Sequence, residues 1–322
     1  MIRVLDSTLK IISTITRYTS VEFEKNFNDY GTFTVQLPKA SGNTNLKKNN
    51  IINHKRNYGI IKYISETDSE IIIKGFDLKY ILAQRVAQGS KSGKAETVIK
   101  GYISDTIKGN RSIDKFSSAE NAARGETVSH TIDGAELLSD TVAAICETQD
   151  WGYDIAVTDG AMVFDICVPK TVSHVYSKRK NNIKSCEYTL DALGEKNVIY
   201  NTDSEGNTST VYSETKTGLE RVEAVATESG TTDEIKAAAL KTIRDSVSET
   251  LDAEILRPDD YGTVWNIGDY VSIKHFISGG EITVTKQITA VTEVYEASAH
   301  RVTPTFGKVK ESIFRKIIRG RA

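Results

Sequence analysis

The residues with the greatest chemical capacity are a glycine-rich loop, dispersed histidines and cysteines, and a pair of carboxylates. The loop Gly89–Ala95, GSKSGKA, resembles a phosphate-binding loop, but it places three residues between its glycines where that motif has four. It also has alanine at position 95, where the motif requires a Ser or Thr that binds magnesium. We therefore interpret this segment as a flexible loop and predict no nucleotide site.

Cysteine and histidine side chains, the usual nucleophiles, bases and metal ligands, have no spacing that brings them together. The sequence contains neither the HExxH nor the CxxC pattern of zinc sites. Three cysteines cannot all pair, so we expect reduced, buried thiols from a cytoplasmic folding environment. A pairing of Cys186 with a histidine in the folded chain, as in a hydrolase, is left open by the sequence. The side chains concerned are His54, His130, His174, His275, His300, Cys146, Cys167 and Cys186.

The most conspicuous carboxylates, Asp259 and Asp260, are poorly placed for acid–base catalysis. Adjacent residues of an extended chain point to opposite faces, so the two groups would not share a cleft. They follow Pro258 and precede Tyr261-Gly262, a composition typical of a turn. Trp151 and Trp265 could stack on sugars, but in alternating strands aromatic side chains are more typical of a core or an interface. The sequence therefore predicts no catalytic residue, no metal site and no cofactor, and hence no enzyme.

Composition excludes further classes of protein. With 322 residues the chain is long enough for two or three domains, because cores rarely grow beyond roughly 250 residues. Its 41 basic and 43 acidic residues give a net charge of −2, which offers no general attraction to nucleic acid or anionic membranes. The amino terminus becomes polar too early for a signal peptide, and no apolar run approaches the roughly eighteen residues of a membrane span. We expect a chain made in the cytoplasm that does not insert into a membrane.

The elements that must position these residues begin with a predicted β domain over residues 1–88. Segments 16–27 and 32–37 alternate around the turn residues 28–31 and indicate a hairpin. Residues 51–64 and 69–74 are further strand candidates. Helical spacing over residues 75–85 predicts a short closing helix.

The hydrophobic period changes in residues 89–185, which we interpret as an α+β insertion. The Gly/Ser/Lys-rich segment 88–96 is typical of a flexible join. Residues 97–107 and 135–149 have apolar residues at helical spacing, and Asp133 with Glu136 has the spacing of a capping box before the second helix. Asp159-Gly160 between two apolar runs indicates a tight hairpin.

Strand patterns return in residues 186–307, which we interpret as a second β domain with a packed helix at 232–252. Residues 197–202 and 208–214 indicate a hairpin, and apolar residues recur every four positions over 234–251. In the run 281–295 the even positions are apolar, as in a half-buried strand. Before it lies a turn around Trp265, Gly268 and Asp269, in which Gly268 would supply the turn conformation and Trp265 would pack beside it. The predicted fold class is therefore β-rich α+β, with two β-barrel-like domains, a smaller α+β insertion and a short C-terminal helix.

The last residues, 308–322, form a basic segment with a predicted apolar stripe. Its six basic side chains and its single carboxylate, Glu311, give a charge of +5, against −2 for the whole chain. A solvated helix end and a dedicated docking segment are both compatible with that pattern. For docking to a partner, the candidate residues are Lys308, Ile313, Phe314, Arg315, Ile317 and Arg319.

Four segments, in order across almost the whole chain, carry a resemblance to a known family. They are 31–38 (GTFTVQLP), 75–85 (GFDLKYILAQR), 265–269 (WNIGD) and 302–307 (VTPTFG). Together they resemble the baseplate hub, or tail-associated (Tal-like), proteins of long-tailed bacteriophages and phage-tail-like particles. The resemblance implies a homotrimer whose six barrels form a ring that joins a six-fold tail tube to a three-fold spike or fibre.

The resemblance also implies partners and a location. A tail tube or distal tail protein would lie above the ring, a spike, fibre or lysin protein below it, and the tape-measure protein in its lumen, through which DNA would pass without sequence-specific binding. The site would be the tail tip of a virion, after synthesis in the host bacterial cytoplasm. Many such proteins continue into a fibre or wall-degrading domain, whereas this sequence ends soon after Gly307, so we expect a separate protein to supply that function. A cell-wall hydrolase and a carbohydrate-binding tail-tip protein are the alternatives.

Overall fold

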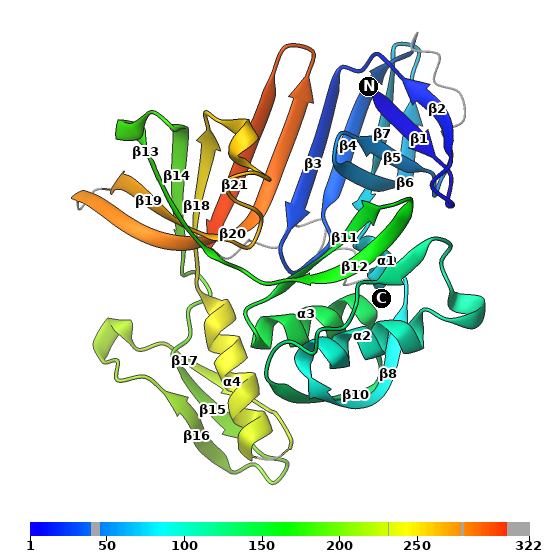
Figure 1. The fold of residues 1–322 in the computed structure, drawn as a ribbon. Coiled ribbons are helices and arrows are strands. Elements are labelled where there is room, and N and C mark those ends of the chain that lie inside the picture. The colour runs from blue at the N-terminus through cyan, green and yellow to red at the C-terminus, as the bar shows by residue number, and fades with distance from the viewer. Residues whose placement is uncertain (40–45, 231, 278–279, 308–322) are drawn as a thin grey trace. The chain divides into compact units, whose positions relative to one another are not determined.

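The computed structural model describes residues 1–39, 46–230, 232–277 and 280–307 (Figure 1). The chain forms two compact units, of which the first comprises Met1–Cys186 with Ala253–Phe306 and the second comprises Glu187–Asp252 with Gly307–Ala322. The fold is β-rich α+β, as predicted. The four-part division after residues 88, 185 and 307 stays a prediction, and the C-terminal helix predicted within 308–322 lies outside the described residues.

The first β region of unit 1 encloses an apolar core. Its strands are β1 (Ile2–Leu5), β2 (Ile11–Ile15), β3 (Ser20–Asn26), β4 (Thr32–Pro38), β5 (Ile51–His54), β6 (Asn57–Glu66) and β7 (Glu70–Asp77). They pair antiparallel in the order β3-β4-β7-β6-β5-β1-β2. Phe33, Val35 and Leu37 are buried, which confirms the alternation predicted for β4, and the Phe33 ring stacks on Phe23 with centroids 5.5 Å apart.

Two predictions for this region are wrong in detail. The strand predicted over 51–64 is a hairpin, because the chain turns between β5 and β6 at Lys55, whose φ is +54°. Neither glycine nor proline occupies that turn. The helix predicted over 75–85 is only the single turn α1 (Tyr80–Ala83), because β7 continues to Asp77.

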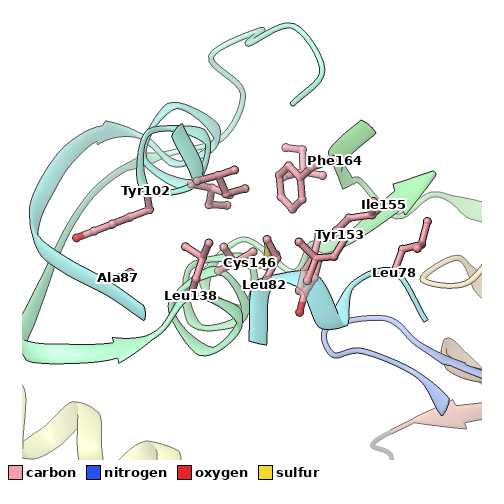
Figure 2. Packing of buried hydrophobic residues seen from close by; sticks show 14 of the residues in the cluster. Leu78, Leu82, Ala87, Tyr102, Leu138, Cys146, Tyr153, Ile155 and Phe164 are labelled. Carbon is pink, nitrogen blue, oxygen red and sulfur yellow. The ribbon is translucent and has the colours of Figure 1, made fainter. Parts of the chain in front are cut away.

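Between the two β regions, helices pack on a small sheet and share one core (Figure 2). The core includes Tyr102 of α2, Leu138 and Cys146 of α3, and Tyr153 and Phe164 of the β11–β12 hairpin. The hairpin turns at Asp159-Gly160, both with positive φ, as predicted. The elements are β8 (Val86–Lys94), α2 (Ala95–Thr106), the 3-10 turn Gly109–Arg111, β9 (Phe116–Ser118), β10 (Thr127–Leu137), α3 (Leu138–Thr148), β11 (Gly152–Thr158) and β12 (Ala161–Cys167).

This region also corrects two predictions. The segment predicted as a flexible join is strand β8, because β10 supplies its hydrogen-bonding partner along most of its length. The predicted capping box is wrong, since Asp133 and Glu136 belong to β10 and Leu137 at the start of α3 makes no side-chain cap. Pairing with a neighbouring strand outweighs local composition at both places.

The second β region returns to strand structure. Its strands are β13 (Thr171–Ser177), β14 (Ile183–Asp191), β18 (Ser248–Ile255), β19 (Tyr270–Ile277), β20 (Gly280–Glu296) and β21 (His300–Gly307), with 3-10 turns at Lys178–Lys180 and Pro258–Asp260. The neighbours run β13-β19-β20-β21-β18-β14. After β13, the Asn182 side chain bridges back to that strand, donating to Val175 O (3.0 Å) and accepting from Ser177 N–H (2.8 Å). This bridge holds the two end strands of the series near each other.

Strand β20 joins the two β regions into one sheet, and Figure 1 shows it beside β3. Residues 290–296 of β20 pair antiparallel with 20–26 of β3. A register shift between Ile288 and Ala290 reverses the faces of the strand. Beyond it the odd positions are buried, including Glu293 and Tyr295, so the predicted even-position pattern is wrong for the end of β20.

The second unit is a small sheet with one helix. It contains β15 (Val198–Thr202), β16 (Thr208–Ser213), the 3-10 turn Gly218–Glu220, β17 (Glu223–Ala226) and α4 (Thr232–Ser246). The β15–β16 hairpin confirms the prediction, and α4 packs against both strands. The helix predicted over 232–252 ends at Ser246, because residues from Ser248 onward enter β18 and pair in a sheet.

We expect Phe33→Ala to destabilise unit 1 strongly. The Phe33 ring lies where a Cβ on Gly59 or Gly75 would be 2.3 Å or 2.7 Å from it, so these neighbours have no side chain to fill the space it leaves. Loss of such a ring costs about 3–5 kcal/mol in the free energy of unfolding. Chemical denaturation followed by far-UV circular dichroism measures the loss. The matched control is Phe276→Ala, whose ring is 57% exposed and whose loss should cost about 0.5 kcal/mol or less. Equal effects of the two substitutions would contradict the packing described.

Candidate functional site at the junction of the two β regions

The turn predicted from Trp265, Gly268 and Asp269 lies where the two β regions and the intervening helical region meet. Gly268 has a φ of +95° and its N–H donates to Ile288 O (2.7 Å). Trp265 is buried and stacks on Tyr261 with ring centroids 4.9 Å apart. The buried carboxylate of Asp269 accepts from the backbone N–H groups of Asn266 (2.8 Å) and Lys170 (3.2 Å). The turn is thus tied both to β20 and to the segment before β13.

Phe27, at the end of β3, connects three parts of unit 1. Its ring occupies space that a side chain on Gly268 or Gly152 would need, since a Cβ there would lie 2.2 Å or 2.4 Å from ring carbons. Its backbone N–H donates to Thr289 O (2.9 Å), and its carbonyl accepts from Tyr153 N–H (3.4 Å). Phe27 therefore packs between glycines of the second β region and of the β11–β12 hairpin.

Polar contacts reinforce the same junction. The ammonium of Lys79, after β7, donates to Asn26 O and lies 5.1 Å from the Tyr153 ring centroid. The Tyr270 hydroxyl donates to the carboxylate of Asp150, which follows α3. These contacts connect the end of the first β region, the helical region and the start of β19.

The buried carboxylate of Glu293 forms the charged part of the junction. It is 1% exposed and accepts hydrogen bonds from Arg56 Nη2 (2.9 Å), Asn57 Nδ2 (2.9 Å) and the Tyr295 hydroxyl (2.7 Å). Arg56 also donates from Nη1 to Tyr261 O (2.7 Å), and its guanidinium lies 3.8 Å from the Tyr261 ring centroid. The β5–β6 turn of the first region is thereby bonded to β20 and to the loop before β19 in the second.

The environment of these groups shifts their proton affinities. Burial acts to raise the pKa of Glu293, but the charge of Arg56 and the hydrogen bonds from Tyr295, Asn57 and Arg56 outweigh it and lower the pKa. Burial, followed by the positive charges of the amino terminus and Lys55, lowers the pKa of His54 to about 4. The ring of His54 packs between Tyr18 and Tyr295, at centroid distances of 5.3 Å and 4.6 Å.

A cavity of about 290 Å³ adjoins the junction. It is lined by cationic and anionic side chains from both the first β region and β11, so its charges largely offset one another. The lining residues are Lys25, Lys55, Arg56, Tyr58, Asp77, Leu78, Asp154, Ile155, Ala156 and Val157. None of these is a cysteine, serine, threonine or histidine, and the titratable groups of the lining are amines, a guanidinium, a phenol and carboxylates.

The chemically capable side chains considered in the sequence lie apart from this cavity. Cys146 is buried in the helical region, and burial raises its pKa, which disfavours the reactive thiolate. Cys186 lies in β14. Within the described residues no cluster of histidine, cysteine and carboxylate side chains could hold a metal ion, and no helix is long and apolar enough to cross a membrane. The segment with the candidate docking residues Lys308 to Arg319 lies outside the described residues.

Sequence reasoning finds the turn but misses its partners. Arg56 occupies a turn hidden inside a predicted strand, and Glu293 lies on the buried face only because of the irregularity in β20. The strand pattern around Phe27 gives no sign of its contacts to two glycines distant in sequence. The one local signal for the polar pair is Glu293 itself, a carboxylate between apolar residues of a strand pattern.

Comparisons with known proteins concern the family and the fold of the chain. Residues 1–308 match the family model described as Siphovirus ReqiPepy6 Gp37-like protein. The fold is similar to that of the 43 kDa tail protein of prophage MuSo2 from Shewanella oneidensis, with a TM-score of 0.64, 12% identity and 95% of each chain covered. It is also similar to a tail protein from Neisseria meningitidis MC58 (TM-score 0.57, 14% identity, 95% of this chain and 96% of that one).

A third similar structure is prophage tail protein gp18 from Listeria monocytogenes, with a TM-score of 0.56 and 15% identity over 99% of this chain and 98% of that one. No curated protein matches the sequence. Identities this low show the common fold and leave the roles of individual residues to be argued from this chain.

We expect Gly268→Ala to destabilise the junction by more than the backbone strain alone. A side chain at Gly268 meets both an unfavourable φ and the Phe27 ring, whereas Gly89 has a similar φ of +84° and open space around it. Gly89→Ala should therefore cost about 1 kcal/mol in the free energy of unfolding and Gly268→Ala at least about 2 kcal/mol. Combining Gly268→Ala with Phe27→Ala should cost less than the sum of the two. Additive losses would show that the ring and the turn do not interact.

Acidification should weaken the fold through His54 before it affects the carboxylates. Because the pKa of His54 is lower in the folded chain than the roughly 6.5 of an unfolded histidine, its contribution is complete above that pH and declines as pH falls towards 4. We expect the free energy of unfolding to fall by roughly 1–2 kcal/mol between about pH 7 and 5 on this account. His54→Phe keeps an aromatic ring and should flatten that dependence in urea titrations. An unaltered slope in His54→Phe would contradict the assignment.

Proposed function

The chain belongs to the Siphovirus ReqiPepy6 Gp37-like protein family, a family of bacteriophage tail proteins, and from that premise we propose that it is the baseplate hub of a phage or phage-like tail. In this role three copies form a ring to which each chain contributes two barrel-like β regions. The ring joins the six-fold tail tube to a three-fold spike or fibre. Its contribution is structural, with no catalytic step.

One observation carries the proposal most directly: the β3–β20 ladder makes a single sheet of the two β regions. A ring closes only if each chain holds its two contact surfaces at a fixed angle, because an error in that angle is repeated at every subunit. The ladder, the Phe27 contacts and the Arg56–Glu293 pair all resist rotation of one region against the other. A two-part block tied at several points in this way is suited to serve as the subunit of a ring.

The proposed partners follow from the position of a hub. A tail tube or distal tail protein contacts the ring from above, a spike, fibre or lysin protein from below, and the tape-measure protein lies in the lumen through which DNA passes. Thr283 and Thr285 are exposed on β20, so this face stays polar before assembly. The proposed location is the tail tip of a virion or tail-like particle, after synthesis in the host cytoplasm.

Two further roles belong to the same proposal. The Trp265–Asp269 turn acts as a construction element of the second barrel, supported by its bonds to β20 and to Lys170. The basic segment with Lys308, Ile313, Phe314, Arg315, Ile317 and Arg319 docks against the spike-side partner or a neighbouring subunit. Its charge of +5 suits an acidic surface on that partner.

We expect the purified chain to form a trimer, whose mass is measured by light scattering. The trimer forms either from the chain alone or after the neighbouring tail proteins are added. The physical reason is that a hub ring buries obligate interfaces, which commonly exceed about 2,000 Å² in total. A chain without residues 308–322 should lose binding to the spike-side protein or assemble less well with neighbouring subunits, and unchanged assembly together with unchanged partner binding would contradict the docking role. A persistent monomer in the presence of every tail component would contradict the hub, and clearing of purified cell wall in a zymogram would favour the hydrolase alternative.

A further inference from the structure

The second β region carries a basic surface around an exposed aromatic ring. Phe276 of β19 is 57% exposed, and the Arg179 guanidinium lies 5.5 Å from its ring centroid. Lys178 and Lys180 flank Arg179 in the 3-10 turn after β13, and Lys274 is next to that turn because it pairs with Ser177. All of the cations are exposed. We call Phe276, Arg179 and these three lysines the basic patch.

The geometry of the patch is fixed by the backbone around it. Ser177 accepts from Lys180 N–H through its hydroxyl (3.1 Å), and its own N–H is bonded to Asn182 (2.8 Å). Glu281, opposite Phe276 on β20, lies 3.8 Å from the Arg179 guanidinium and holds it near the ring. The lysines of the turn remain exposed on this ordered backbone.

The first β region carries a surface of the opposite kind at the β6–β7 hairpin. Glu66, Asp68 and Glu70 are all exposed there, and Tyr63, before the tip, is 52% exposed. The tip is ordered, since the Thr67 hydroxyl accepts from Glu70 N–H (3.1 Å) and Thr67 N–H donates to Glu70 O (2.9 Å). We call residues 63–70 the acidic hairpin. Each of the two surfaces combines exposed apolar area with an excess of charge of one sign, offset in part by Glu281 at the basic patch and by Lys39 at the acidic hairpin.

We propose that the basic patch of one copy of this chain binds the acidic hairpin of the next copy. The inference rests on the proposed ring and names the surfaces that form it. The two surfaces lie on opposite sides of unit 1 (Figure 1), with β20, β3 and β4 between them in the sheet order, so they cannot meet within one chain. A contact between unlike surfaces of identical chains runs head to tail and closes into a ring when the rotation permits.

Charge and apolar area both favour this partner. Glu66 pairs with Lys39, but among the described residues no side-chain ion pair engages Lys178, Lys180, Asp68 or Glu70, so these four can pair across an interface. The whole chain has a net charge of only −2, so the attraction comes from local separation of the two signs. Aromatic and arginine side chains such as Phe276 and Arg179 are typical of the centre of an interface, with charged groups around it.

A charge-swap experiment on the full chain tests the contact. One variant carries Lys178→Glu and Lys180→Glu, a second carries Asp68→Lys and Glu70→Lys, and a third carries all four substitutions. Each single-sided variant juxtaposes like charges, so we expect its association in low salt to weaken by at least about tenfold in sedimentation equilibrium. The four-fold variant should regain association to within about threefold of the wild type, because opposite charges face each other again. High salt should weaken the wild-type association.

Controls separate this inference from the proposed function. Lys94→Glu with Lys115→Glu makes the same charge change at exposed lysines away from both surfaces and should leave association unchanged. Circular dichroism and the unfolding midpoint should match the wild type for every variant.

If the wild type forms trimers and the single-sided variants do so equally well, the contact is wrong and the ring stands. If the four-fold variant is not restored, the two surfaces do not bind each other. A wild-type chain that never associates, even with the tail proteins, overturns both the ring and this contact.

Discussion

The Phe27 ring imposes the constraint on which the rest of unit 1 depends. It fills the space between Gly152 and Gly268, so the β11–β12 hairpin and the turn before β19 can approach β3 only without side chains at those positions. The backbone of Phe27 is bonded to both sides as well. Because the three parts come from distant stretches of sequence, none can shift without losing contact with the other two. The β3–β20 ladder extends the same constraint along a whole strand.

The Arg56–Glu293 pair fixes the orientation of the β5–β6 turn relative to β20, and its burial has a cost in stability. Removing a carboxylate from water is unfavourable, and hydrogen bonds from Arg56, Asn57 and Tyr295 are needed to offset it. The side chain of Arg56 remains 40% exposed, so the pair is only half desolvated. An apolar pair could hold the regions together as strongly, but it would tolerate sliding. The two arms of the guanidinium bind different acceptors, Nη2 the Glu293 carboxylate and Nη1 the Tyr261 carbonyl, so the planar group favours one alignment of the β5–β6 turn on β20.

The local sequence is sufficient to predict the structure of a segment when that structure depends on a single strand or hairpin. The alternation of Phe33, Val35 and Leu37 and the turn at Asp159-Gly160 each depend on residues that are neighbours in the chain, and the structure confirms both. Prediction fails where distant pairing decides the structure. The Gly/Ser/Lys-rich composition of β8 is typical of a loop, and the segment forms a strand only because it pairs with β10, which lies far along the chain. The register shift in β20 that buries Glu293 cannot be recognised from the composition of that strand. The junction could not be predicted, since its contacts join residues far apart in the chain, such as Arg56 and Glu293.

The way the chain enters and leaves the second unit has an evolutionary consequence. The longer segment of the unit, Glu187–Asp252, begins within β14 and ends within β18, and these two strands are neighbours in one sheet. Its entry and exit points are therefore held side by side by backbone hydrogen bonds, whatever sequence lies between them. A segment anchored in this way can be lengthened, shortened or replaced while the strands on either side keep their register. The topology of the segment Glu187–Asp252 is therefore that of an insertion between two paired strands.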